Sequence, residues 1–121
     1  MSKSEDLVRL QHMLDAARKA IEFTKNCSRA DLDKDEKLTL SMVRLLEILG
    51  EAAKNVSKQC RQEHPAIQWS QIAGTRDRLI HGYFDVDLGI IWKIVSDDLP
   101  LLVTQLEKAI TNSQRSSKNK K

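Results

Sequence analysis

The sequence predicts an all-α protein, an up-and-down bundle of four to five helices. Four Gly and two Pro in 121 residues leave few turns, whereas an all-β chain of this length needs many. Aromatic residues make up only 4% of the chain, and aliphatic residues dominate its apolar set, which favours helices over a β-sandwich. Apolar residues also recur at three- and four-residue steps. The length fits one domain, placed at residues 1–112, with a basic tail at residues 113–121 that we expect to be disordered.

The first helix is predicted from a single apolar stripe, which consists of Leu7, Leu10, Leu14, Ala17 and Ile21. Ser4 is the expected N-cap, because acidic residues follow it in the first turn. The stripe fades near Cys27, and the polar segment 26–35 is predicted to be a connection.

A second and longer stripe predicts a helix that ends at about His64, because Pro65 follows. Its apolar members are Leu38, Met42, Leu45, Leu46, Leu49, Ala52, Ala53, Val56 and Cys60. Gly50 interrupts it, and a mid-helix glycine often marks a close approach of two helices, since it costs about 1 kcal/mol relative to Ala.

A short third helix is expected, with Ser70 as N-cap and Gly82 just past its C-terminus.

The last helix is predicted from a stripe that continues through a proline. Its apolar members are Leu88, Ile91, Trp92, Val95, Leu99, Leu102, Leu106 and Ile110. Because the register continues past Pro100, we expect a kink or a fresh helix start there, which Asp97 or Asp98 could cap.

The net charge of +3 comes entirely from the C-terminal segment 111–121, which carries four cations and no acid. Without those four cations the rest of the chain has a net charge of −1. Such a segment could attract nucleic-acid phosphates without sequence preference. A solvated tail that only keeps the protein soluble explains the composition equally well.

The two cysteines, Cys27 and Cys60, lie far apart and show neither zinc-ligand spacing nor a disulfide framework. The polar, acidic N-terminus is unlike a signal peptide, and no apolar run is long enough to cross a membrane. The sequence therefore predicts a cytoplasmic protein with reduced thiols, and no metal or other cofactor is expected. His12 and His64 are interpreted as solvated or structural residues.

One short segment concentrates the residues that can do chemistry, namely Arg76, Asp77, His81 and Tyr83. Asp77 and His81 are four apart, so they would share a helix face where the carboxylate can hold the imidazole. The carboxylate and the helix C-terminus would both favour the protonated ring. Arg76 could reach a phosphate bound near the helix end, and Tyr83 is expected to be exposed just beyond that end.

These residue types suit cleavage of a phosphodiester bond without a metal. A histidine can accept a proton from a ribose 2′-hydroxyl or donate one to the leaving oxygen, an effect of about 10²–10⁴ in rate. An arginine can hold the phosphate with two hydrogen bonds. The reaction needs an acid and a base, and a two-fold dimer would bring two histidines to one cleft. A salt-bridged surface is the alternative reading of the cluster. Glu51 is either a solvated residue or an acid directed toward it.

The run Arg76-Asp77-Arg78-Leu79-Ile80-His81-Gly82-Tyr83 matches an R-x4-H-x-Y pattern, and with it the sequence resembles the HepT toxins of the HEPN superfamily. The likeness covers about residues 7–110, including the segments around Gly50 and Trp69. It implies a HEPN-like helical bundle and a homodimer whose motifs meet at a cleft. It also implies a metal-independent ribonuclease with Arg76 and His81 catalytic and Asp77 part of the site, although many relatives carry Asn at that position.

The resemblance further implies a partner, a minimal nucleotidyltransferase antitoxin of the MNT type that transfers AMP from ATP to the motif tyrosine, here Tyr83. The added bulk and negative charge would block the cleft and repel RNA phosphates. Two other classes of function stay open. Arg76 and His81 could recognise nucleotide phosphate in a non-catalytic module that binds nucleotide or the transferase. The bundle could also be a plain interaction protein that only docks a partner.

Overall fold

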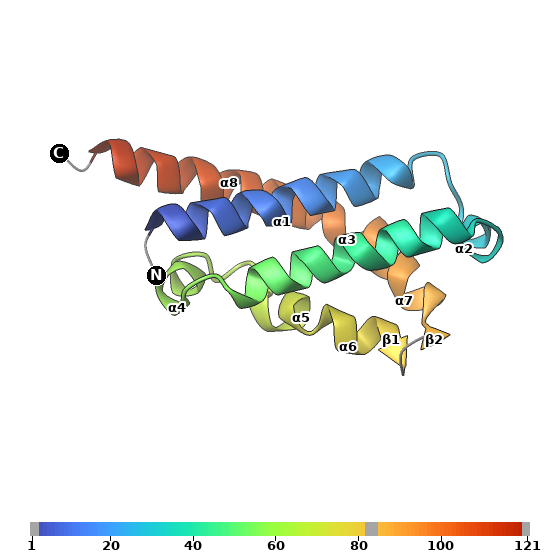
Figure 1. Cartoon of the computed structure of the whole chain (residues 1–121). Coiled ribbons are helices and arrows are strands. Elements are labelled where there is room, and N and C mark those ends of the chain that lie inside the picture. Colours follow the sequence, from blue (N-terminus) through green and yellow to red (C-terminus); the bar gives the residue numbers. More distant parts are fainter. Residues whose placement is uncertain (1–2, 82–84, 120–121) are drawn as a thin grey trace.

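The computed structural model describes residues 3–81 and 85–119 of the protein. Three long helices form its frame. They are α1 (Lys3–Phe23), α3 (Glu36–Lys54) and α8 (Leu99–Asn119), and α1 packs against both of the others. Figure 1 shows that α3 returns alongside α1, that the short α5 and α6 run forward again, and that α7, η1 and α8 return. This arrangement confirms the predicted all-α class.

Helix α2 (Arg29–Lys34) lies in the segment that the sequence analysis expected to be only a connection. A capping box starts this helix, because the backbone N–H of Ser28 donates to the Asp31 carboxylate at 2.6 Å. Its single core residue, Leu32, is 2% exposed. One buried side chain in six residues gives no periodic pattern, which explains why the prediction missed the helix.

Helix α3 ends at Lys54, and a separate helix, α4 (Lys58–Glu63), follows, so the single helix predicted up to His64 is wrong. The break has a long-range cause. The backbone N–H and the hydroxyl of Ser57 both donate to the carboxylate of Asp6 on α1, at 2.8 and 2.6 Å. The Ser57 hydroxyl also accepts from the Cys60 N–H and caps α4. The predicted stop before Pro65 is correct.

The predicted third helix is two short ones, α5 (Trp69–Ala73) and α6 (Thr75–Leu79), on either side of Gly74. Ser70 lies inside α5 and is not its N-cap. After α6 the chain enters a small antiparallel pair, in which β1 (Ile80–His81) faces β2 (Asp85–Val86). The predicted helix end at Gly82 is wrong, because α6 ends at Leu79 and the chain is already extended at Ile80; Gly82 itself lies outside the described residues.

The chain then returns through α7 (Leu88–Lys93) and a π-helical turn, η1 (Ile94–Asp98), directly into α8. The π-helical turn ends two residues before Pro100, which cannot donate the N–H that a regular α-helical turn requires. Asp97 and Asp98 lie inside this turn and do not cap a new helix. Helix α8 continues to Asn119, so most of the expected disordered tail has helical backbone.

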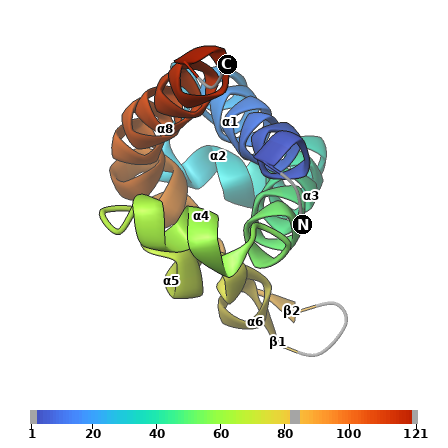
Figure 2. The ribbon, with the colours of Figure 1, turned by 90° about the vertical axis from the view of Figure 1, so that its left-hand side faces the viewer.

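The core lies between the long helices and is built from aliphatic side chains. Its fully buried members include Leu10, Met13, Met42, Leu46, Leu49, Leu79, Ile91, Leu99 and Leu106. Gly50 marks a close approach, as predicted, because a Cβ there would lie 3.0 Å from the Ile72 carbonyl oxygen. The same packing holds α5 and α6 against α3, and Figure 2 shows α6, β1 and β2 at the periphery of the bundle. Among the described residues, no helix combines the length and apolar character needed to cross a membrane.

Candidate active site

Arg76 is presented to solvent by a helix that is itself firmly anchored. Its neighbours Thr75 and Leu79 are 3% and 0% exposed, and the Thr75 hydroxyl donates to the Ile72 carbonyl at 2.7 Å. The Arg76 side chain is 71% exposed and pairs with Glu47 of α3, with 3.6 Å between Nε and Oε2. The backbone is therefore held in place while the guanidinium is available to a ligand.

Arg76, Asp77 and Glu51 border one open hollow of about 620 Å³. Helices α1, α3 and α6 form its walls. The three residues that the sequence analysis singled out, two on α6 and one on α3, therefore lie on one face. The cations that line it are Arg9, Arg44, Lys54 and Arg76, and the acids are Glu47, Glu51 and Asp77. We call this feature the Arg76 hollow. An exposed guanidinium with cations around it suits a phosphate, because charge-assisted hydrogen bonds to phosphate are among the strongest in proteins.

Glu51 meets both descriptions that the sequence left open. It is exposed, and it also lines the Arg76 hollow. The acid that pairs with Arg76 is nevertheless Glu47, one turn earlier on α3. Sequence reasoning missed Glu47, because nothing in the spacing along the chain shows which turn of α3 faces α6.

Helix α1 adds His12 to the same hollow. The sequence analysis took His12 for a solvated residue, and its side chain is indeed exposed. No local motif connects it with the segment 74–83, and only the packing of α1 on α3 brings it there.

The predicted geometry of Asp77 and His81 is wrong. Helix α6 ends at Leu79, and His81 lies in β1, where it pairs with Asp85 across the hairpin. The two residues therefore do not share a helix face, and the structure describes only the backbone of His81. Tyr83 lies outside the described residues. The catalytic roles of Arg76, Asp77 and His81 stay predictions.

Among the residues whose side chains the structure describes, no group of three or more His, Cys, Asp or Glu is arranged to hold a metal ion.

The Ribonuclease HepT-like family model matches residues 13–109, which include the Arg76 hollow's α3 and α6 walls and the whole R-x4-H-x-Y segment. The chain belongs to this family. That membership confirms the resemblance to HepT proteins of the HEPN superfamily, which the motif and its flanking segments had indicated.

Three relatives of this HepT-like protein match it over most of the length of both chains. A candidate RNase of Caldanaerobacter subterraneus subsp. tengcongensis is 43% identical over 101 residues, 84% of this chain and 90% of the relative. A candidate ribonuclease HepT of Thermococcus cleftensis is 39% identical over 99 residues, 82% and 90% of the two chains. A candidate RNase of Methanocaldococcus jannaschii is 34% identical over 107 residues, 88% and 98%. No solved structure matches this chain.

Proposed function

We propose that this HepT-like protein is a cytoplasmic endoribonuclease that cleaves RNA without a metal ion, with Arg76 and His81 catalytic and Asp77 supporting them. The observation that most supports this proposal is the position of Arg76. The motif arginine is 71% exposed over a hollow that four cations and three acids line, on a helix that buried Thr75 and Leu79 hold in place.

In the proposed reaction, Arg76 binds the scissile phosphate and stabilises the charge that develops on its oxygens. His81 accepts the proton of the ribose 2′-hydroxyl, and the 2′-oxygen attacks phosphorus while the bond to the 5′-oxygen breaks. A protonated histidine gives that leaving oxygen its proton, so the products are a 2′,3′-cyclic phosphate and a free 5′-hydroxyl. A homodimer supplies the second His81 for this step.

The family membership supports a regulatory role for the same site. We propose that the protein is the toxin of a HEPN/MNT toxin–antitoxin system. The MNT-type nucleotidyltransferase would act on Tyr83, whose hydroxyl oxygen attacks the α-phosphorus of ATP and releases pyrophosphate. The AMP group would place a negative charge two residues from His81 and repel RNA from the cleft.

The test is RNA cleavage by the purified, unmodified full chain in excess chelator, with labelled transfer RNA as substrate. Intact mass is measured first to show that Tyr83 carries no AMP. We expect wild type to cut, and His81→Ala to lose about 10²–10⁴ in rate, with a comparable loss for Arg76→Ala. His64→Ala and Arg29→Ala are matched controls outside the Arg76 hollow and should retain activity.

Two results would overturn the proposal. One is wild-type activity in the His81→Ala protein. The other is no cleavage of transfer RNA or of a mixed cellular RNA pool, which would favour the alternative of a non-catalytic module that binds nucleotide or the transferase. Circular dichroism of each variant separates lost chemistry from lost fold.

A further inference from the structure

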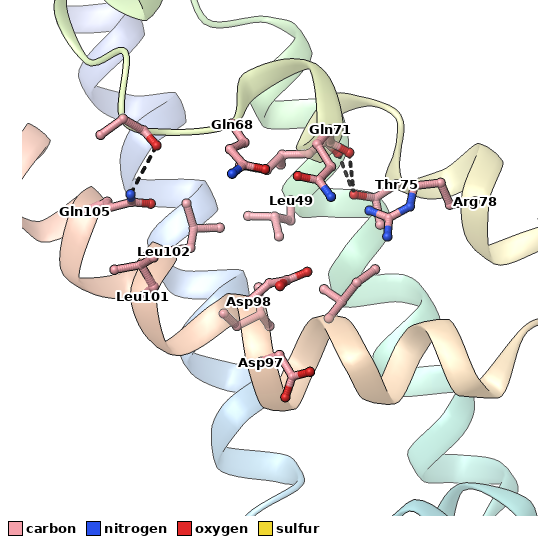
Figure 3. Close-up of a pocket in the computed structure, with 14 residues that line it drawn as sticks. Leu49, Gln68, Gln71, Thr75, Arg78, Asp97, Asp98, Leu101, Leu102 and Gln105 are labelled. Atoms are coloured by element: carbon pink, nitrogen blue, oxygen red, sulfur yellow. Dashed lines mark hydrogen bonds between the residues drawn. The ribbon is translucent and has the colours of Figure 1, made fainter.

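A second cavity, of about 120 Å³, lies between α5–α6 and η1–α8 (Figure 3). We call it the ring slot. Its inner wall is apolar and buried, formed by Leu49, Ile94, Leu99 and Leu102, which are 1–5% exposed. Arg76 and Arg78 are two residues apart on α6, so their side chains leave the helix in roughly opposite directions. Arg76 borders the Arg76 hollow, and Arg78 borders the ring slot.

Polar groups of complementary kinds surround the mouth of the ring slot. Gln68 and Gln71 carry amides that both donate and accept, Arg78 only donates, and Asp98 only accepts. Figure 3 shows Asp98 projecting from the wall opposite Gln71 and Arg78. Gln105 also lines the slot, but its amide already donates to the Ala66 carbonyl at 3.1 Å.

Size and charge narrow the choice of ligand. A volume of about 120 Å³ is well below the roughly 300–1,000 Å³ of sites for drug-sized ligands, so it suits one flat ring. The charged lining residues are Arg78, Asp97 and Asp98, and this excess of acid disfavours a phosphate or a carboxylate. A neutral ring with apolar faces and hydrogen-bonding edges fits both the buried wall and the polar mouth.

We propose that the ring slot binds one unpaired nucleobase of the RNA substrate, an inference that rests on the proposed ribonuclease function. Unpaired bases are recognised in this way, by contact with their faces and hydrogen bonds to their edges. A strand that crosses α6 would place a phosphate at Arg76 and a neighbouring base in the slot. The base would then decide which position in a single-stranded RNA is presented for cleavage.

The first test uses nucleosides, which have no phosphate and therefore do not depend on Arg76. Adenosine, guanosine, cytidine and uridine are each titrated into the full chain, with methyl groups observed by NMR. We expect saturable shifts of the Leu49, Ile72 and Leu102 methyl signals with at least one nucleoside. An absence of such shifts with all four nucleosides would overturn the proposal.

A blocking variant and a matched control make this test sharper. Leu101 lines the slot and is 63% exposed, so Leu101→Trp can cover the mouth without disturbing the core. Leu40 on α3 is 60% exposed and does not line the slot, which makes Leu40→Trp the control. Nucleoside binding should be lost in the first variant and kept in the second. Unchanged shifts in Leu101→Trp would contradict the assignment.

The polar mouth is tested separately by Gln71→Ala and Asp98→Ala, with Gln114→Ala on exposed α8 surface as the control. Each lost hydrogen bond should weaken nucleoside binding about fivefold and change the base found next to the cut in RNA. Nucleoside binding without RNA cleavage would support base binding in the ring slot and contradict the proposed ribonuclease function. RNA cleavage with no nucleoside binding, and with the same base preference in Leu101→Trp as in wild type, would contradict base binding in the ring slot and support the ribonuclease function.

Discussion

Arg76 on α6 and Glu47 on α3 form an ion pair at the edge of the Arg76 hollow, with 3.6 Å between Nε and Oε2. The arginine is 71% exposed and the glutamate 27% exposed. Exposed pairs of this kind contribute only about 0–1 kcal/mol, so a bound phosphate can displace the carboxylate at little cost. If RNA binds at Arg76 as proposed, Glu47 would pair with Arg76 in the absence of RNA and would compete with the RNA phosphate for it.

This competition predicts that Glu47→Gln binds RNA more tightly. Removing the carboxylate should lower the Kd for a 2′-deoxy, non-cleavable RNA analogue by about twofold to fivefold at low salt, and less at high salt. Glu22→Gln removes the same charge from an exposed position outside the hollow and serves as control. Weaker binding by Glu47→Gln alone would show instead that Glu47 holds Arg76 in its binding orientation.

The long helices were predictable because each carries its own apolar stripe. Leu10 and Leu14, Leu46 and Leu49, and Leu106 recur with helical spacing and are buried where that spacing places them. What interrupts the helices was harder to predict. The end of α3 depends on Asp6 of α1, whose carboxylate accepts a hydrogen bond from the Ser57 N–H.

The motif predicted which residues form the candidate site, and their catalytic roles stay predictions, but it did not predict their geometry. The motif gave Arg76 and His81, but the end of α6 at Leu79 depends on a hairpin whose described strands have two residues each. A strand of that length leaves no alternation in the sequence. Glu47 and His12 reach the Arg76 hollow only through the packing of α1 and α3, which local spacing does not encode.

Gly50 predicts the consequence of a single added methyl group. In Gly50→Ala the new Cβ would lie 3.0 Å from the Ile72 carbonyl oxygen. This backbone atom also accepts a hydrogen bond from the Thr75 hydroxyl. We expect the clash to outweigh the gain in helix propensity and to lower the free energy of unfolding by about 1–2 kcal/mol. Chemical denaturation measures the change.

Gly89→Ala is the matched control for this substitution. Gly89 is an exposed helical glycine of α7, and among the described residues its added Cβ would meet only the Asp87 side chain, at 3.4 Å. Here the helix-propensity term should dominate, and stability should rise by up to about 1 kcal/mol. A stabilising Gly50→Ala would show that α5 can move away from α3.

The bond between Asp6 and Ser57 predicts a large effect from a residue far from the hollow. Asp6 is 7% exposed and accepts both the N–H and the hydroxyl of Ser57. Asp6→Ala leaves both donors without their partner and should cost about 1–3 kcal/mol of stability. Asp15→Ala breaks an exposed pair with Lys19 on the same helix and should cost less than about 1 kcal/mol. Equal losses would contradict the structural role of Asp6.

The two cysteines should differ in reactivity. Cys60 is 5% exposed, and burial raises the pKa of its thiol from 9.0 to about 11, with smaller contributions from the charges of Asp6 and Glu63. The thiolate is the reactive form, so Cys60 should resist alkylation in the native protein while the partly exposed Cys27 reacts. Mass spectrometry after iodoacetamide treatment at pH 8 gives the order, and faster labelling of Cys60 would contradict it.

The raised pKa of Cys60 also makes stability depend on pH in a defined window. Below about pH 9 the thiol is protonated in both the folded and the unfolded chain, so it contributes no slope. Between pH 9 and about 11 the unfolded chain loses the proton and the folded chain keeps it, so the free energy of unfolding falls by about 1.4 kcal/mol per pH unit. Other groups titrate there too, and subtracting the Cys60→Ala profile from that of wild type isolates this slope. Cys27→Ala should leave the slope in place, and a flat difference profile for Cys60→Ala would mean that the Cys60 thiol ionises equally well in both states.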